Sequence, residues 1–141
     1  MNRQHVRYFV TALVATFVAA IAVGGLVVSL SPAAAGAAFI AGWWANLATA
    51  GTVAMLGARR VARVYTDPRL GRVAGTAMGV WTGFGSALGL LAYAYFVTRV
   101  YQADTKMGLA VAFMIVTFVI SIIAGSITGR ETAHPPEEEE V

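Results

Sequence analysis

The chain contains 141 residues, of which 58% are hydrophobic and 12% are charged, and it carries a formal net charge of +3. It has no cysteine, so disulfide frameworks, thiolate metal sites, thiol redox chemistry and haem attachment through cysteine are excluded. Because its mean hydropathy is +0.71, the chain is predicted to form one membrane domain with short connections, and no nucleic-acid partner is expected.

Four long apolar stretches contain no charged residue, and each is long enough to cross a bilayer as a helix. Hydrocarbon offers no hydrogen-bond partner to an exposed backbone, so a chain of this kind must be helical where it crosses. The sequence therefore predicts an all-α integral membrane protein, an antiparallel bundle of four transmembrane helices within residues 1–130. The predicted spans are residues 8–30, 33–58, 73–97 and 107–127.

The first stretch follows two arginines and continues for more than twenty residues. The apolar region of a secretory signal is typically about 7 to 15 residues long. We therefore expect this stretch to be retained as a membrane helix. Ser31 and Pro32 come directly after it, and they suit the cap and the first turn of the next helix. The first two spans are thus predicted to form a tight antiparallel hairpin.

Two aspartates are placed to cap the later helices. Asp67 precedes a proline in the middle loop, an arrangement typical of a helix start. The third helix is therefore predicted to begin there and to enter the membrane near Arg72 or Val73. Asp104 is placed to open the fourth helix in the same way.

Basic residues are distributed unequally among the segments outside the spans. Eight arginines lie before the first span, in the middle loop or after the last span. The loop before the last span has only Arg99 and Lys106. The positive-inside rule then places both termini and the middle loop in the cytoplasm. We expect one fixed orientation, in the cytoplasmic membrane of a prokaryote. The eight arginines are Arg3, Arg7, Arg59, Arg60, Arg63, Arg69, Arg72 and Arg130.

The middle loop is expected to bind anionic lipid headgroups, since each basic residue near the membrane surface contributes about 1 kcal/mol. Its arginines are Arg59, Arg60, Arg63, Arg69 and Arg72. On the same side, residues 131–141 form a polar, proline-interrupted segment with several glutamates. This segment is predicted to be a disordered acidic tail that is freely solvated. A tail that folds over the arginine loop or reaches a basic partner is the alternative.

Small residues recur every four positions along the predicted helices. In the third span they form a glycine zipper, with a second, offset pair at Gly85 and Gly89. Lipid tails are as apolar as leucine, so helices associate in a membrane through the close contact that small residues permit. We expect these ridges to pack the bundle together, while docking of a partner or self-association is the alternative. The ridge residues are Gly71, Gly75, Gly79 and Gly83 in the third span, and Ala38, Gly42, Asn46 and Ala50 in the second.

Asn46 is the most polar side chain deep in any predicted span. An amide in hydrocarbon needs a hydrogen-bond partner, so Asn46 must face the bundle or another subunit. The favoured interpretation is an interhelical hydrogen bond to a hydroxyl such as Thr82 or Ser86, or to a carbonyl. The functional alternative is a contact with a solute in a pore, extended by a seam of intramembrane serines and threonines.

Aromatic side chains fall into two groups. Tyr93, Tyr95 and other rings near the end of the third span are expected to anchor the helix at the membrane interface. Trp43, Trp44 and Trp81 lie about ten residues into their helices, deeper than anchoring residues usually lie. They are expected to fill gaps opposite glycines, or else to face a lipid, quinone, pigment or neighbouring subunit.

No predicted span contains Asp, Glu, His, Lys or Arg. Proton relays and ion-coupled transporters depend on such residues within the membrane. This disfavours a proton-coupled pump, an intramembrane protease and a metalloenzyme, so we expect no catalytic residue, no metal and no evident cofactor. The leading hypothesis is a non-catalytic small subunit that stabilises a larger multisubunit membrane complex and holds lipid or cofactor at its edge. The alternative is a small homo-oligomeric channel or carrier for a neutral or anionic solute, lined by Asn46 and hydroxyl side chains.

Overall fold

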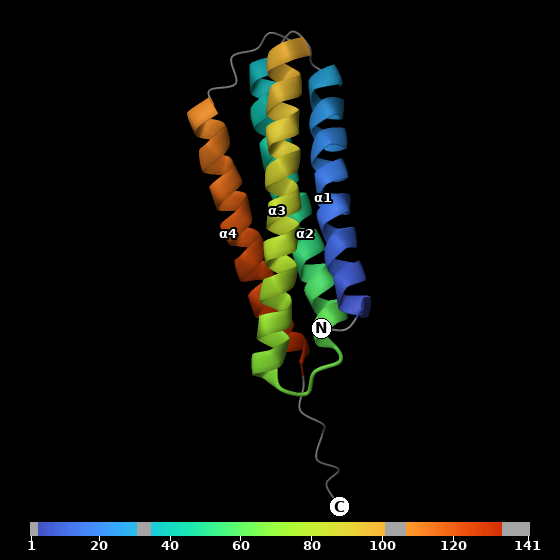
Figure 1. Ribbon diagram of the computed structural model, residues 1–141. Helices are drawn as coiled ribbons and strands as arrows, with labels where there is room; N and C mark the ends of the chain where they lie inside the picture. Colours follow the sequence, from blue (N-terminus) through green and yellow to red (C-terminus); the bar gives the residue numbers. More distant parts are fainter. Residues whose placement is uncertain (1–2, 31–34, 101–106, 134–141) are drawn as a thin grey trace, which may run out of the picture.

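A computed structural model describes residues 3–30, 35–100 and 107–133, with the side chains of residues 35–39 left undescribed. The described chain is a four-helix bundle whose helices alternate in direction (Figure 1). This confirms the predicted all-helical bundle. The helices are α1 (Arg3–Leu30), α2 (Ala35–Ala62), α3 (Pro68–Val100) and α4 (Met107–Thr132).

Three of the helices, α1, α3 and α4, are long and apolar enough to cross a membrane. They indicate an integral membrane protein. α2 has the same length as α1, 28 residues, but its described part, in which Trp43, Trp44 and Asn46 lie, does not reach the mean hydropathy of the other three. Length and hydropathy therefore identify three of the four predicted spans.

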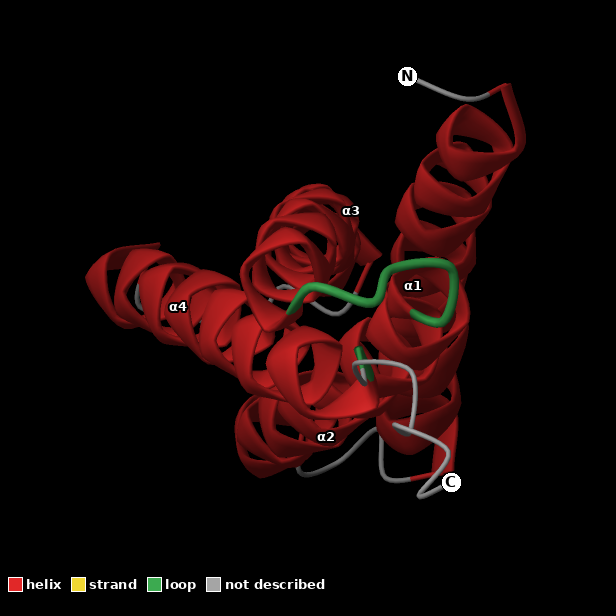
Figure 2. Ribbon diagram, turned by 90° about the horizontal axis from the view of Figure 1, so that it is seen from below, coloured by secondary structure: helices red, strands yellow, loops and turns green. Residues whose placement is uncertain are grey.

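α2 and α3 form the middle of the bundle. Within the described residues, each of them contacts all of the other helices, whereas α1 and α4 do not contact one another. Viewed along the bundle, α1 and α4 diverge on either side of α3, and α2 lies below them (Figure 2). As a result, α3 buries residues on several faces, while α1 and α4 each bury a narrow stripe.

The stripe on α1 follows the four-residue spacing of small residues in the sequence. Every member is buried, and on the opposite side of the helix Val14, Val18, Ile21 and Leu26 are exposed. In a membrane protein this arrangement directs the large apolar side chains toward lipid and the small ones toward neighbouring helices. The buried residues of α1 are Phe9, Ala12, Thr16, Ala20, Gly24 and Val28.

The start of α3 confirms the predicted cap. Oδ1 of Asp67 accepts a hydrogen bond of 2.8 Å from the backbone N–H of Arg69, and the helix begins at Pro68. The end of α4 differs from the prediction. Glu131 and Thr132 continue α4 past the expected start of the tail, and Thr132 Oγ1 donates to the carbonyl of Thr128 at 2.7 Å. The predicted caps at Ser31 and Asp104, and the tail from residue 134 on, lie outside the described residues.

The long glycine ridge of α3 faces α4. A Cβ atom at Gly75 would lie 2.9 Å from the Cα of Gly129, and one at Gly79 would lie 2.7 Å from the Cα of Ile122. At Gly83 it would lie 2.8 Å from the Phe118 ring. Such distances are too short for any real side chain, so glycine is required where the two backbones meet. Gly71 lies in the same row, opposite Ala133 and Gly129.

The offset pair of glycines on α3 faces α1 instead. A Cβ atom at Gly89 would lie 2.9 Å from the carbonyl oxygen of Phe17, and one at Gly85 would meet the carbonyl of Leu13. Two registers of the same four-residue spacing therefore serve two different neighbours of one helix. This explains why the sequence of α3 carries both.

Tyr93 corrects the prediction of interfacial anchoring at the end of the third span. Its ring is buried between α1 and α2, where a Cβ atom at Gly24 would lie 2.6 Å from the ring and one at Gly42 would lie 2.7 Å from the hydroxyl oxygen. Two glycines on separate helices thus open a slot for one large ring. Tyr95, two residues further, is exposed, and the Arg99 guanidinium lies 5.5 Å from the centre of its ring.

Candidate functional site

The polar centre of the bundle is a contact between α2 and α3. Asn46 is 2% exposed, and its Nδ2 donates a hydrogen bond of 2.7 Å to the hydroxyl oxygen of Ser86. This confirms the predicted interhelical hydrogen bond, with Ser86 as the partner. On the same face of α2, Gly42 meets Tyr93 and Ala50 is buried, while the side chain of Ala38 lies outside the described residues.

Most intramembrane hydroxyls bond to their own helix. Thr16 donates to the Ala12 carbonyl at 2.7 Å, and Thr49 and Ser121 make equivalent bonds to carbonyls four residues earlier. The hydroxyl oxygens of Thr82 and Thr117 are buried with no hydrogen-bond partner among the described residues. Apart from Ser86, the described serines and threonines therefore make no hydrogen bond to Asn46 that would extend it into a polar seam.

A double-mutant cycle on Asn46→Leu and Ser86→Ala is expected to give a coupling free energy of about 1 kcal/mol, the usual size for a hydrogen bond between membrane helices. Unfolding of the purified bundle in mixed micelles measures it. The control pairs Asn46→Leu with Ser29→Ala, since Ser29 donates to the Gly25 carbonyl of its own helix. A coupling that does not exceed that of the control would contradict the Asn46–Ser86 bond.

The three tryptophans occupy different environments. Trp43 is 1% exposed and its ring lies 4.5 Å from that of Phe113 on α4, so it fills the interior as expected. Trp44 is 59% exposed and meets the edge of the same Phe113 ring. Trp81 is 41% exposed and stacks against Phe9 of α1 with 6.5 Å between ring centres. Of the three tryptophans, only Trp43 therefore fills a gap inside the bundle.

One end of the bundle carries nearly all of the described positive charge. The start of α1, the end of α2, the start of α3 and the end of α4 meet there (Figure 1). The eight arginines that the sequence assigns to one side of the membrane all lie in these segments, and Arg99 lies at the opposite end of α3. We call this the arginine end. The only carboxylates among the described residues, Asp67 and Glu131, are also found there.

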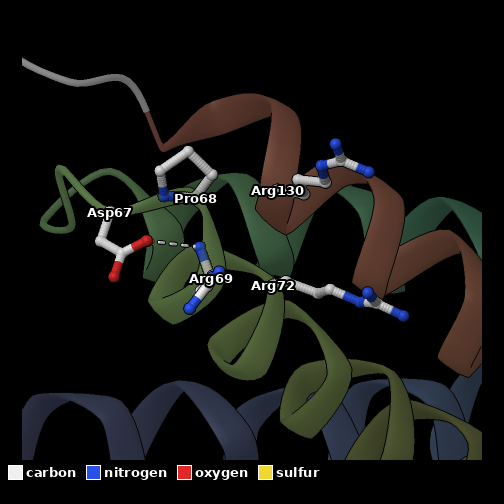
Figure 3. A pocket seen from close by; sticks show the side chains of 5 residues that line it. All are labelled: Asp67, Pro68, Arg69, Arg72 and Arg130. Carbon is white, nitrogen blue, oxygen red and sulfur yellow. Dashed lines mark hydrogen bonds between the residues drawn. The ribbon is translucent and has the colours of Figure 1, made fainter.

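A hollow of about 410 Å³ opens at the arginine end, where α3 begins and α4 ends. Figure 3 shows the five residues that line it, with the Asp67 carboxylate bonded to the backbone of Arg69. Arg72 reaches across to α4, and its Nε donates to the hydroxyl of Ser126 at 3.2 Å. The three arginines of the hollow can receive an anionic group, but its aspartate already offsets part of their charge. The lining residues are Asp67, Pro68, Arg69, Arg72 and Arg130.

A second hollow of about 460 Å³ lies between α1 and α2, also at the arginine end. Its walls are mainly apolar and include Ala12 and Ala15 of α1 and Val53 and Leu56 of α2. Arg59, Arg60 and Arg63 also line it. We call it the α1–α2 groove. The sequence marked its arginines but not its walls, because alanines spaced along a helix do not reveal which neighbour they face.

Across the described part of the chain, no group of three or more His, Cys, Asp or Glu side chains is placed to hold a metal ion. Comparison of the chain with protein-family models, with curated proteins and with solved structures finds no match.

Proposed function

We propose that this protein is a small, non-catalytic subunit of a larger membrane complex, which it stabilises by packing against a partner within the bilayer. All four helices cross the membrane in this proposal, and the arginine end lies on the cytoplasmic side. The excess of arginine at that end supports the orientation through the positive-inside rule.

The position of α2 within the bundle supports its role as a fourth span. α2 contacts each of the other helices, and its polar side chain Asn46 is buried and hydrogen-bonded rather than left to lipid. A span of lower hydropathy is stable in a membrane when its polar group is satisfied inside the bundle.

The observation that carries the proposal is an exposed aromatic face in the middle of α3. Trp81 and Phe84 are 41% and 51% exposed, and they lie near the centre of a 33-residue helix. Such a helix is about 50 Å long, and Phe84 lies at its centre, whereas Trp81 lies level with Phe9 near the start of the first predicted span. The stacking of Trp81 on Phe9 fixes one ring in place. A rigid aromatic surface of this kind suits contact with a partner helix.

Extraction of the source membrane in mild detergent, followed by native mass spectrometry, tests the proposal. We expect this chain in a heteromeric particle much heavier than its own 14.8 kDa. The double variant Trp81→Ala/Phe84→Ala is expected to leave the particle. The control is Ile115→Ala/Val119→Ala, which alters exposed residues on α4. Recovery of the unmodified chain only in free form would count against the proposal.

The channel hypothesis receives no support from the geometry around Asn46. The amide is buried and donates to Ser86, and none of the hollows at the arginine end is lined by it. A homo-oligomeric particle whose solute flux in liposomes is lost on Asn46→Leu would favour transport instead.

A further inference from the structure

The walls of the α1–α2 groove have the form of a site for an apolar chain. On α1, Ala12 and Ala15 replace the large branched side chains that cover most of the helix, so the surface is indented there. The buried side chain of Met78 from α3 also lines the groove. Leu56 provides an exposed apolar wall on α2. A hollow of about 460 Å³ results, and most of its lining is apolar.

The arginines of the groove continue one of its walls. Leu56 and Arg60 lie at positions i and i+4 of α2, so they share a face of the helix, Arg59 lies beside them, and Arg63 follows directly after the end of the helix. The apolar wall therefore leads directly into a cluster of guanidinium groups at the membrane surface. Tyr8, an aromatic residue of the kind that favours this interface, lies on the α1 side.

No described carboxylate lines this groove. Asp67 lines another hollow at the arginine end, and Glu131 lines a neighbouring hollow together with Arg59 and Arg63, so Glu131 offsets part of the charge of these two arginines. Guanidinium groups bind phosphate strongly because their planar N–H donors match its oxygen atoms. Three arginines against one neighbouring carboxylate leave a net positive charge, so the groove combines a site for an anion with an adjoining apolar surface.

We propose that the α1–α2 groove binds one glycerophospholipid with an anionic headgroup. One acyl chain lies against the apolar walls, and the phosphate contacts Arg59, Arg60 and Arg63. This inference rests on the proposed crossing of the membrane, with the arginine end at one surface. It does not depend on a partner protein. A free phosphate ion would use the arginines but would leave the alanine-lined walls without an occupant, so the lipid accounts for both features.

Titration of the purified full chain with lipid in a non-ionic detergent, read by native mass spectrometry, tests the proposal. The probes are phosphatidylglycerol and phosphatidylcholine with identical acyl chains. We expect one phosphatidylglycerol molecule to bind at least about tenfold more tightly than phosphatidylcholine, from the attraction of several arginines near the headgroup. Glycerol 3-phosphate, which has the phosphate without the acyl chains, is expected not to displace it.

Two sets of variants separate the headgroup from the chain. Arg59→Gln/Arg60→Gln/Arg63→Gln is expected to weaken phosphatidylglycerol binding at least about tenfold. Its control, Arg3→Gln/Arg69→Gln/Arg130→Gln, removes the same charge from the same end but outside the groove, and it is expected to retain the bound lipid. Ala15→Phe fills the groove and leaves every arginine in place, and it is expected to remove the bound lipid. Its control is Ala22→Phe, two turns further along the exposed face of α1.

Several outcomes would overturn the site. Equal losses in the two arginine variants would mean that the lipid is attracted by the total charge of this end and not by the groove. Unchanged binding in Ala15→Phe would mean that no chain occupies the groove, and displacement by glycerol 3-phosphate would identify a site for the phosphate alone. If Ala15→Phe alters the helical circular dichroism, Ala15→Leu replaces it, with Ala22→Leu as its control. Because purified chain is used, these results are independent of whether a membrane complex is found.

Discussion

Gly75→Ala is expected to lower the free energy of unfolding of the bundle by about 3 kcal/mol, the upper part of the usual cost of overpacking an interior. The added Cβ would meet the carbonyl oxygen of Gly125 and would lie 2.9 Å from the Cα of Gly129. Both neighbours are backbone atoms of α4, so no side chain can rotate away. The two helices must therefore separate, and the contacts along their whole shared ridge weaken together.

Reversible unfolding of the purified protein in mixed micelles, with an increasing fraction of denaturing detergent, measures this loss. Tryptophan fluorescence follows the unfolding. Gly51→Ala is the matched control, since a Cβ atom there would have nothing within 4 Å. It is expected to change the free energy of unfolding by less than about 0.5 kcal/mol, apart from the helix preference of alanine. If the two alanine variants proved equally stable, the close approach of α3 and α4 would be wrong.

Trp43→Ala is expected to lower the free energy of unfolding by about 3 to 5 kcal/mol, the usual cost of removing a large buried aromatic side chain. Trp43 is packed in a cluster with Val28 of α1 and Leu90 of α3, and its ring meets Phe113 of α4. Its removal therefore leaves a cavity among the helices. Lipid tails cannot fill an enclosed cavity, so the dispersion contacts of its lining are lost.

The neighbouring Trp44 supplies the control for this prediction. Trp44 is 59% exposed, so its replacement by alanine leaves an open surface that lipid or detergent covers. We expect Trp44→Ala to cost about 1 kcal/mol, mainly through the lost edge contact with Phe113. The same micelle unfolding experiment compares the two variants. Equal losses would contradict the placement of Trp43 inside the bundle and Trp44 outside it.

The ridges of small residues were predictable in position but not in partner. Their four-residue spacing placed Gly71, Gly75, Gly79 and Gly83 on one face of a helix, because 3.6 residues complete a turn. A ridge suits any helix that can approach it closely, so its spacing does not name the neighbour. The fold assigns this ridge to α4 and the offset pair Gly85 and Gly89 to α1.

Adjacent or nearby aromatic residues were harder to distinguish. Trp43 and Trp44 have the same chemistry, and their side chains differ in direction by the rotation of one helix residue. The packing of α1, α3 and α4 against α2 decides which of them is buried. Tyr93 was predicted to anchor at the interface because it lies near the end of an apolar stretch. It is buried instead because Gly24 and Gly42, on two other helices, leave room for its ring.

By itself, the sequence determined the class of protein, the helices and the clustering of arginine at the ends of particular segments. These properties are local: hydropathy, four-residue spacing and caps act within a few turns of one helix. The tertiary structure alone decided that Asn46 bonds to Ser86, that Trp81 faces outward, and that Ala15 and Arg60 line one groove. Each of these depends on how helices distant in sequence are rotated against one another, and the periodicity of a single helix does not specify that rotation.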